Sequence, residues 1–120
     1  MTTFSALRAK HQGAWLEHLR ARLAELVEHQ PQLEQRPDQI WLFGSRARGD
    51  WDGWSDTDLL VVAENQGIAS AWADLLIGAG LGGDVIPMDR SRWQALPSHA
   101  SAIWRAVARE ALPLLAADQP

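Results

Sequence analysis

Two aspartates one residue apart, Asp56 and Asp58, are the first candidates for chemistry in this chain. They precede the apolar run "LLVVA", whose valines and leucines are typical of a strand. Side chains two positions apart on a strand point to one face, with Cα atoms roughly 6.5–7 Å apart. Carboxylates at that separation suit a pair of divalent ions, and oxygen ligands favour Mg²⁺ or Mn²⁺ over zinc.

A third carboxylate has two candidates. Asp84 opens another apolar segment, "DVIPM", and joins the same site if that strand pairs beside the first. Asp89 lies beyond Pro87, where a turn is expected, and stays open as a substitute. The alternative reading is that these aspartates only solubilise the ends of strands. Aspartate is disfavoured in strands, which favours a bound ion.

A second group of residues has the character of a phosphate site. Gly44 and Ser45 follow the apolar run "IWLF", and a helix that begins there would have Ser45 as its N-cap. Free backbone N–H groups at such a helix start bind phosphate readily. Arg46 and Arg48 would add positive charge. Taken alone, the segment fits an ordinary capped helix equally well, but the aspartate pair that follows favours binding.

The elements that must position these residues follow from the hydrophobic pattern. Residues 4–29 predict a long amphipathic helix, with Leu7 on its apolar face, and residues 31–39 predict a connector. Strands are expected at 40–43, 57–64 and 84–88, and Pro87 places the last at its end or on a sheet edge. Helices are expected at 68–77, 90–96 and 99–115. This order predicts an α/β fold, a small mixed sheet of three to four strands with helices packed on it.

Composition sets the broad class. The chain has 120 residues, a formal net charge of −4 and no cysteine. We expect a single domain over 1–120, with an N-terminal helix (1–30), a catalytic core (40–88) and C-terminal helices (89–120). The acidic balance argues against nucleic acid as a partner. No signal peptide or membrane span is evident, so we expect a cytoplasmic protein.

Seven tryptophans and no tyrosine are unusual at this length. Trp51 and Trp54 lie in the loop between the phosphate half and the carboxylate half of the motif. Three roles stay open for them: stacking on a nucleobase, packing on a partner protein, or closing the loop over the core.

The string "GSRARGDWDGWSDTDLL", from Gly44 to Leu60, resembles the signature of the minimal nucleotidyltransferases, members of the DNA polymerase β-like superfamily. "GDVIP" lies where that family places its third carboxylate, and "IWRAVAREALPLL" is similar to its closing helix. The resemblance covers Ile40 to about Met88.

The resemblance implies a nucleotide site and a metal site that share one reaction. It assigns nucleotide binding to Gly44, Ser45, Arg46 and Arg48, and catalysis and metal binding to Asp56, Asp58 and Asp84. The expected reaction is Mg²⁺- or Mn²⁺-dependent transfer of a nucleoside monophosphate, with ATP as the expected donor of AMP.

The same resemblance implies a partner. Minimal nucleotidyltransferases are often antitoxins paired with a HEPN-domain ribonuclease toxin, on which they adenylylate a hydroxyl group. The chain has no tyrosine, so a tyrosine acceptor must lie elsewhere. Two alternatives stay open: a non-catalytic antitoxin that neutralises its partner by binding, and a nucleotidyltransferase that modifies an antibiotic. A homo-oligomer is also open.

Overall fold

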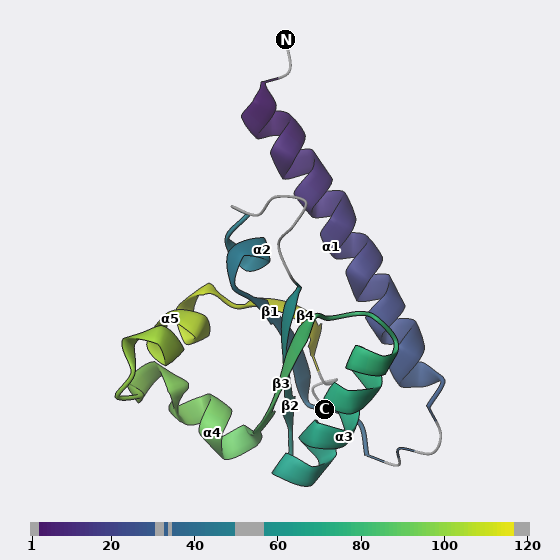
Figure 1. The fold of residues 1–120 in the computed structure, drawn as a ribbon, viewed down its shortest axis with the longest axis vertical. Helices are drawn as coiled ribbons and strands as arrows, with labels where there is room; N and C mark the ends of the chain where they lie inside the picture. Colours follow the sequence, from purple (N-terminus) through teal and green to yellow (C-terminus); the bar gives the residue numbers. More distant parts are fainter. Residues whose placement is uncertain (1–2, 31–32, 34, 50–56, 117–120) are drawn as a thin grey trace.

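The structure is a computed structural model that describes residues 3–30, 33, 35–49 and 57–116. Its elements follow one another as a long helix, strands and short helices (Figure 1). In chain order they are α1 (Phe4–Glu28), β1 (Gln39–Phe43), α2 (Ser45–Arg48), β2 (Asp58–Ala63), α3 (Gln66–Gly78), β3 (Asp84–Asp89), α4 (Arg90–Ala95), a 3-10 turn (Leu96–Ser98), α5 (Ala102–Glu110) and β4 (Leu112–Ala116).

The four strands form one mixed sheet in the order β3-β2-β1-β4. Strands β2 and β3 are parallel, whereas β1 is antiparallel to both β2 and β4. The expected α/β class with a small mixed sheet is confirmed. Pro87 lies on β3, an edge strand, where its missing N–H is tolerated. The strand nevertheless continues past Pro87 to Asp89, so the alternative that it ends there is wrong.

Helices cover both faces of the sheet (Figure 1). Strand residues alternate between the faces, so Leu59 and Val61 join the core beneath α1 and α3, while Leu60 and Val62 join the core beneath α4 and α5. Trp72 of α3 is the largest fully buried side chain of the described residues. β2 is buried on both faces, which explains why its sequence is a continuous apolar run.

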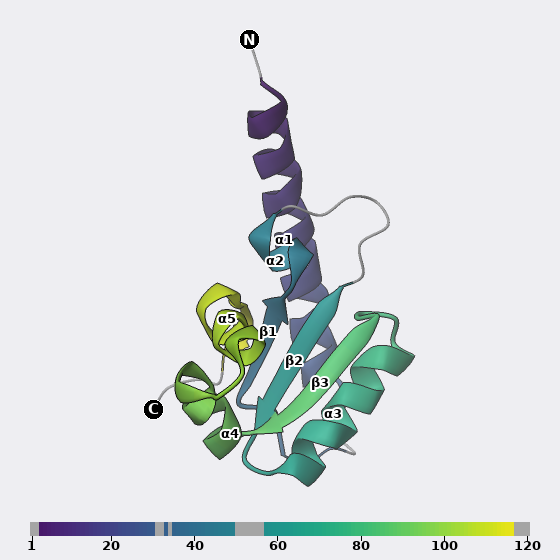
Figure 2. The same ribbon diagram turned by 60° about the vertical axis from the view of Figure 1, so that its left-hand side comes forward.

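The N-terminal turns of α1, before Gln12, extend beyond the sheet and its other helices (Figures 1 and 2). Side chains from Ala6 to His11 are exposed, and Leu7 keeps 41% of its surface. The expected apolar face is therefore confirmed only further along, where Leu19 and Leu23 are buried. The expectation for Leu7 is wrong because α1 is longer than the sheet that it covers.

The C-terminal segment departs most from expectation. The predicted helix over 99–115 is α5, which ends at Glu110, followed by strand β4. Pro113 cannot continue a helix, because it lacks an N–H and its ring clashes with the preceding turn. β4 pairs with β1 instead, with Leu112 opposite Leu42. The resemblance to a closing helix, and the expectation of helices through 89–120, are wrong for Leu112–Ala116.

Candidate functional site

Asp58 and Asp84 lie next to each other at one end of the sheet. Each is the first residue of its strand, and the two are paired in the parallel register of β2 and β3. Paired residues on neighbouring parallel strands point to the same face, with strands about 4.8 Å apart. The backbone N–H groups of Gly83 and Asp84 both donate to the carbonyl of Thr57, which fixes this end of β3 against β2. The site therefore contains two adjacent carboxylates.

Asp89 lies at the other end of β3, opposite Ala63. It lies five positions after Asp84 along the strand, a span of roughly 16 Å. Its carboxylate accepts a hydrogen bond of 2.8 Å from the backbone N–H of Arg92 and caps α4. Asp89 therefore does not share a site with Asp58, and Asp84 is the aspartate of β3 that does.

Gly44 lies directly against the carboxylate of Asp58. Its φ is +77°, and a Cβ at this position would lie 2.5 Å from Asp58 Oδ2. The contact follows from the antiparallel register, which pairs Phe43 with Asp58 at the end of β1. Glycine is required here for two reasons, the left-handed backbone and the close approach. The "GS" half of the motif and the carboxylate half are therefore in contact.

A single helical turn, α2, follows Gly44. The N-cap of α2 is Gly44 and not Ser45, so that expectation is wrong by one residue. The N–H groups of Ala47 and Arg48 both donate to the carbonyl of Gly44, at 3.1 and 3.2 Å. Ser45 is consequently the first helical residue. Gly49, with a φ of +79°, ends the turn.

The two arginines of α2 extend toward different helices. The guanidinium of Arg46 lies over the ring of Trp15 in α1, 4.7 Å from its centroid. Arg48 Nη1 lies 3.4 Å from Glu110 Oε2 in α5. Both side chains therefore contact other elements of the chain, and their expected role in phosphate binding stays a prediction.

A comparison with known families identifies the fold that carries this arrangement. Residues 19–81 match the sequence model of the nucleotidyltransferase domain. The chain belongs to this family. The match includes Gly44, Ser45 and Asp58 and ends just before Asp84. The finer assignment to the minimal nucleotidyltransferases stays a prediction.

Other comparisons add little to the family assignment. The fold is similar to that of a crystal structure of a candidate nucleotidyltransferase from Sulfolobus solfataricus, with a TM-score of 0.48 and 19% identity. That alignment covers 88% of this chain and 84% of the other. No curated protein sequence matches significantly. A likeness of this degree concerns the fold alone.

A nucleotidyltransferase domain implies a nucleoside triphosphate substrate and, typically, a divalent metal. Asp58 and Asp84 supply oxygen donors of the kind that hard cations prefer. Within the described part of the chain, no group of three histidines, cysteines or acidic residues is placed to hold a metal. Asp56, expected to bind the metal together with Asp58 and Asp84, lies outside the described residues, as do Trp51 and Trp54. The two placed carboxylates therefore fit a metal in donor type, and their role as ligands stays a prediction.

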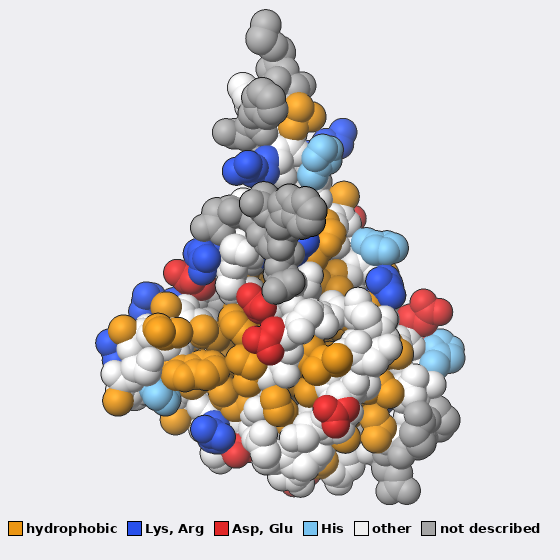
Figure 3. Space-filling view, viewed as in Figure 1, with side chains coloured by type: hydrophobic (Ala, Val, Ile, Leu, Met, Phe, Trp, Pro, Cys, Tyr) orange, Lys and Arg blue, Asp and Glu red, His pale blue; other side chains and the backbone are white. Residues whose placement is uncertain are grey.

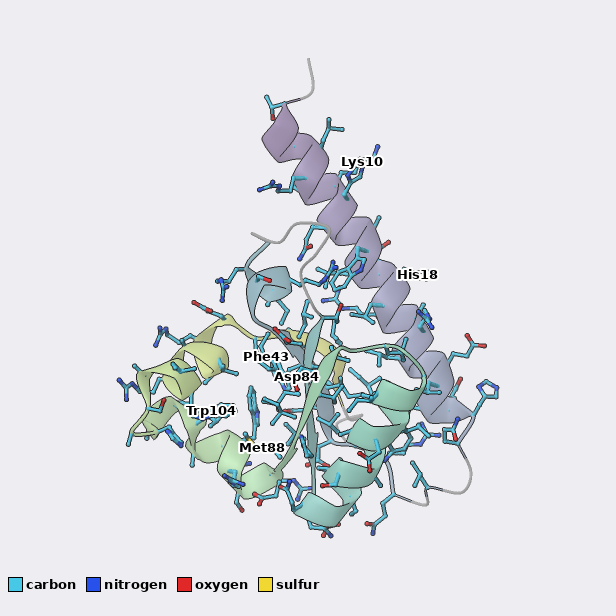
Figure 4. The ribbon with its side chains drawn as sticks, viewed as in Figure 1. Lys10, His18, Phe43, Asp84, Met88 and Trp104 are labelled. Carbon is cyan, nitrogen blue, oxygen red and sulfur yellow. The ribbon has the colours of Figure 1, made fainter. Side chains whose placement is uncertain are left out.

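Hydrophobic side chains border the two carboxylates of the candidate site. Phe43 ends β1 opposite Asp58, and Trp104 of α5 packs against the same face of the sheet (Figure 4). The space-filling view shows acidic side chains near the centre of the molecule, beside hydrophobic side chains (Figure 3). Nothing in the sequence marks Phe43 or Trp104 as part of a site, since an apolar residue near a site looks like an ordinary core residue. Only the pairing of β1 with β2 could have indicated Phe43.

Contacts to α2 were also missed. Gln12, Trp15 and Glu110 each contact an arginine of this turn from a distant part of the chain. No local spacing signals such contacts.

No helix in the part of the chain that the structure describes has both the length and the hydrophobicity to cross a membrane.

Proposed function

We propose that this nucleotidyltransferase domain transfers AMP from ATP to a hydroxyl group on a partner protein. The observation that carries the proposal is the pairing of Asp58 with Asp84, with Gly44 packed against Asp58. This arrangement brings the residues expected to hold phosphate and those expected to hold a cation to one end of the sheet. Nucleotidyl transfer requires both in one place.

The residues have separate roles in the proposed reaction. The loop of Gly44 and Ser45, assisted by Arg46 and Arg48, binds the triphosphate. Asp56, Asp58 and Asp84 would hold Mg²⁺ or Mn²⁺, which supplies charge neutralisation at the transferring phosphate when bound. Asp84 is exposed at the rim of the site, where an incoming hydroxyl can reach it.

The atoms of the step balance without a further reactant. The acceptor oxygen bonds to the α-phosphorus, the bond from that phosphorus to the bridging oxygen breaks, and pyrophosphate leaves. The carboxylate of Asp84 accepts the hydroxyl proton. The chain has no tyrosine, so a tyrosine acceptor would have to lie on another protein. The resemblance to minimal nucleotidyltransferases makes a HEPN-domain toxin the proposed partner and this chain its antitoxin.

The test combines the purified protein, ATP labelled at the α-phosphate, Mg²⁺ and the product of the neighbouring gene, as the candidate HEPN-domain partner. We expect label on the partner with the wild-type protein and none with Asp58→Asn. Asp74→Asn is the matched control, because Asp74 is exposed on α3, away from the site. Transfer that survives in a folded Asp58→Asn protein would contradict the proposal. Binding to the partner without any transfer would favour the non-catalytic antitoxin instead.

A further inference from the structure

The position of α2 depends on contacts from outside the turn. The helix has only four residues, far fewer than an isolated helix needs for stability in water. It nevertheless begins with Ser45 directly after Gly44, the pair expected to bind phosphate. The conformation of that pair is therefore set by the side chains that hold α2.

Helix α1 makes two contacts with one residue of α2. The side-chain amide of Gln12 donates a hydrogen bond to the backbone carbonyl of Arg46. One turn further along α1, the ring of Trp15 lies beneath the Arg46 guanidinium, 4.7 Å from its centroid. Trp15 and Ala47 also pack against the same core cluster. Backbone and side chain of Arg46 are thus both fixed by α1.

Gln12 is placed at the point where α1 leaves the body of the molecule. It is partly buried, whereas His11, Gly13 and Ala14 around it are exposed. At this point of α1, the side-chain amide of Gln12 reaches the backbone of Arg46 in α2.

We propose that Gln12 and Trp15 are positioning residues that hold the Gly44–Ser45 loop in its nucleotide-binding conformation. The expected effect on nucleotide affinity rests on the proposed function. The expected effect on the conformation of α2 does not. A loop that is ordered before the ligand arrives binds more tightly, since less conformational entropy is lost on binding. Glu110 supports the other side of the turn through Arg48.

The chain contains a matched control for Gln12. Arg20, two turns further along α1, also donates side-chain hydrogen bonds to a backbone carbonyl, that of Pro113 in β4, at 3.0 and 3.3 Å. Gln12→Met and Arg20→Met thus each remove a side-chain-to-carbonyl contact from α1. Only the first of these contacts involves α2.

The experiment measures two quantities for these variants. The first is the Kd for a non-hydrolysable ATP analogue with Mg²⁺, by calorimetry. The second is hydrogen exchange at the amides of Ala47 and Arg48, whose N–H groups bond to Gly44. For Gln12→Met we expect a Kd about three- to tenfold higher and faster exchange at both amides. For Arg20→Met we expect wild-type values of both.

Trp15 is tested by a pair of substitutions, since its ring also packs against the core. Trp15→Phe keeps an aromatic face for the guanidinium and should retain most of the affinity, whereas Trp15→Leu should behave like Gln12→Met. Wild-type exchange at Ala47 and Arg48 in both Gln12→Met and Trp15→Leu would overturn the inference. If the wild-type protein binds no nucleotide, the proposed function fails, and the exchange data still decide whether α1 positions α2.

Discussion

Asp58 has neighbours from two distant parts of the sequence. Its β2 position is paired with Phe43 on one side and with Asp84 on the other, and Gly44 packs against its carboxylate. That Asp58 opens a strand could be read from the sequence, because the apolar run after it predicts one. The strand spacing of Asp56 and Asp58 stays a prediction, because Asp56 lies outside the described residues. The contact with Gly44 could not, because it depends on the register in which β1 meets β2.

The Gly44–Asp58 contact predicts an unusual consequence for Gly44→Ala. The new methyl group would overlap Asp58 Oδ2, and a carboxylate end can rotate away, so the substitution displaces a proposed ligand. Gly49→Ala is the control: its φ is also positive, at +79°, but a Cβ there meets no atom of the described residues within 4 Å. Both variants should lose about 1–3 kcal/mol of unfolding free energy, because residues with a side chain rarely adopt either backbone conformation. Only Gly44→Ala should lose nucleotidyl transfer as well.

Denaturant unfolding and the transfer assay together decide this prediction. Equal transfer by the two variants would show that the carboxylate position is not set by Gly44.

Elements whose pattern is local were predicted well. The long helix, the buried strands and α3 agree within two residues, because periodicity and turn residues determine them. β4 was missed because "REALPLL" continues the pattern of α5, and only its pairing with β1 makes it a strand. The N-cap of α2 was predicted one residue too late, at Ser45, for a related reason. Serine is the better cap by side-chain chemistry, but the chain turns at Gly44 through a positive φ that serine rarely adopts.

The strand β3 carries an aspartate at each end, and substitutions of the two are expected to have opposite effects on transfer and stability. Asp84 is exposed and paired with Asp58, so Asp84→Asn should abolish transfer with little change in stability. Asp89 caps α4, so Asp89→Ala should cost about 1 kcal/mol of unfolding free energy and leave transfer intact. Denaturant unfolding and label transfer, measured on both variants, check this pair. Transfer lost in Asp89→Ala but kept in Asp84→Asn would reverse the assignment.

At the scale of the whole molecule, one face of the sheet contains the larger core and the other carries the candidate site. The face beneath α1 and α3 contains the larger core, while the face beneath α4 and α5 carries Asp58 and Asp84 at its end. Helix α1 is the exception, since its middle also reaches α2. On the part of α1 that projects beyond Gln12, the side chains of residues 6–11 are exposed.

Removal of residues 1–11 therefore tests whether the projecting turns of α1 contribute to stability or to nucleotide binding. Because the side chains of residues 6–11 are exposed, their loss should change the free energy of unfolding by no more than about 0.5 kcal/mol. Nucleotide affinity should be retained, since Gln12 and Trp15 remain. Circular dichroism should report less helix, and thermal unfolding should report an unchanged Tm. A large loss of stability that depends on protein concentration would contradict this expectation and indicate that a second copy covers these turns, which light scattering of the full-length protein would verify.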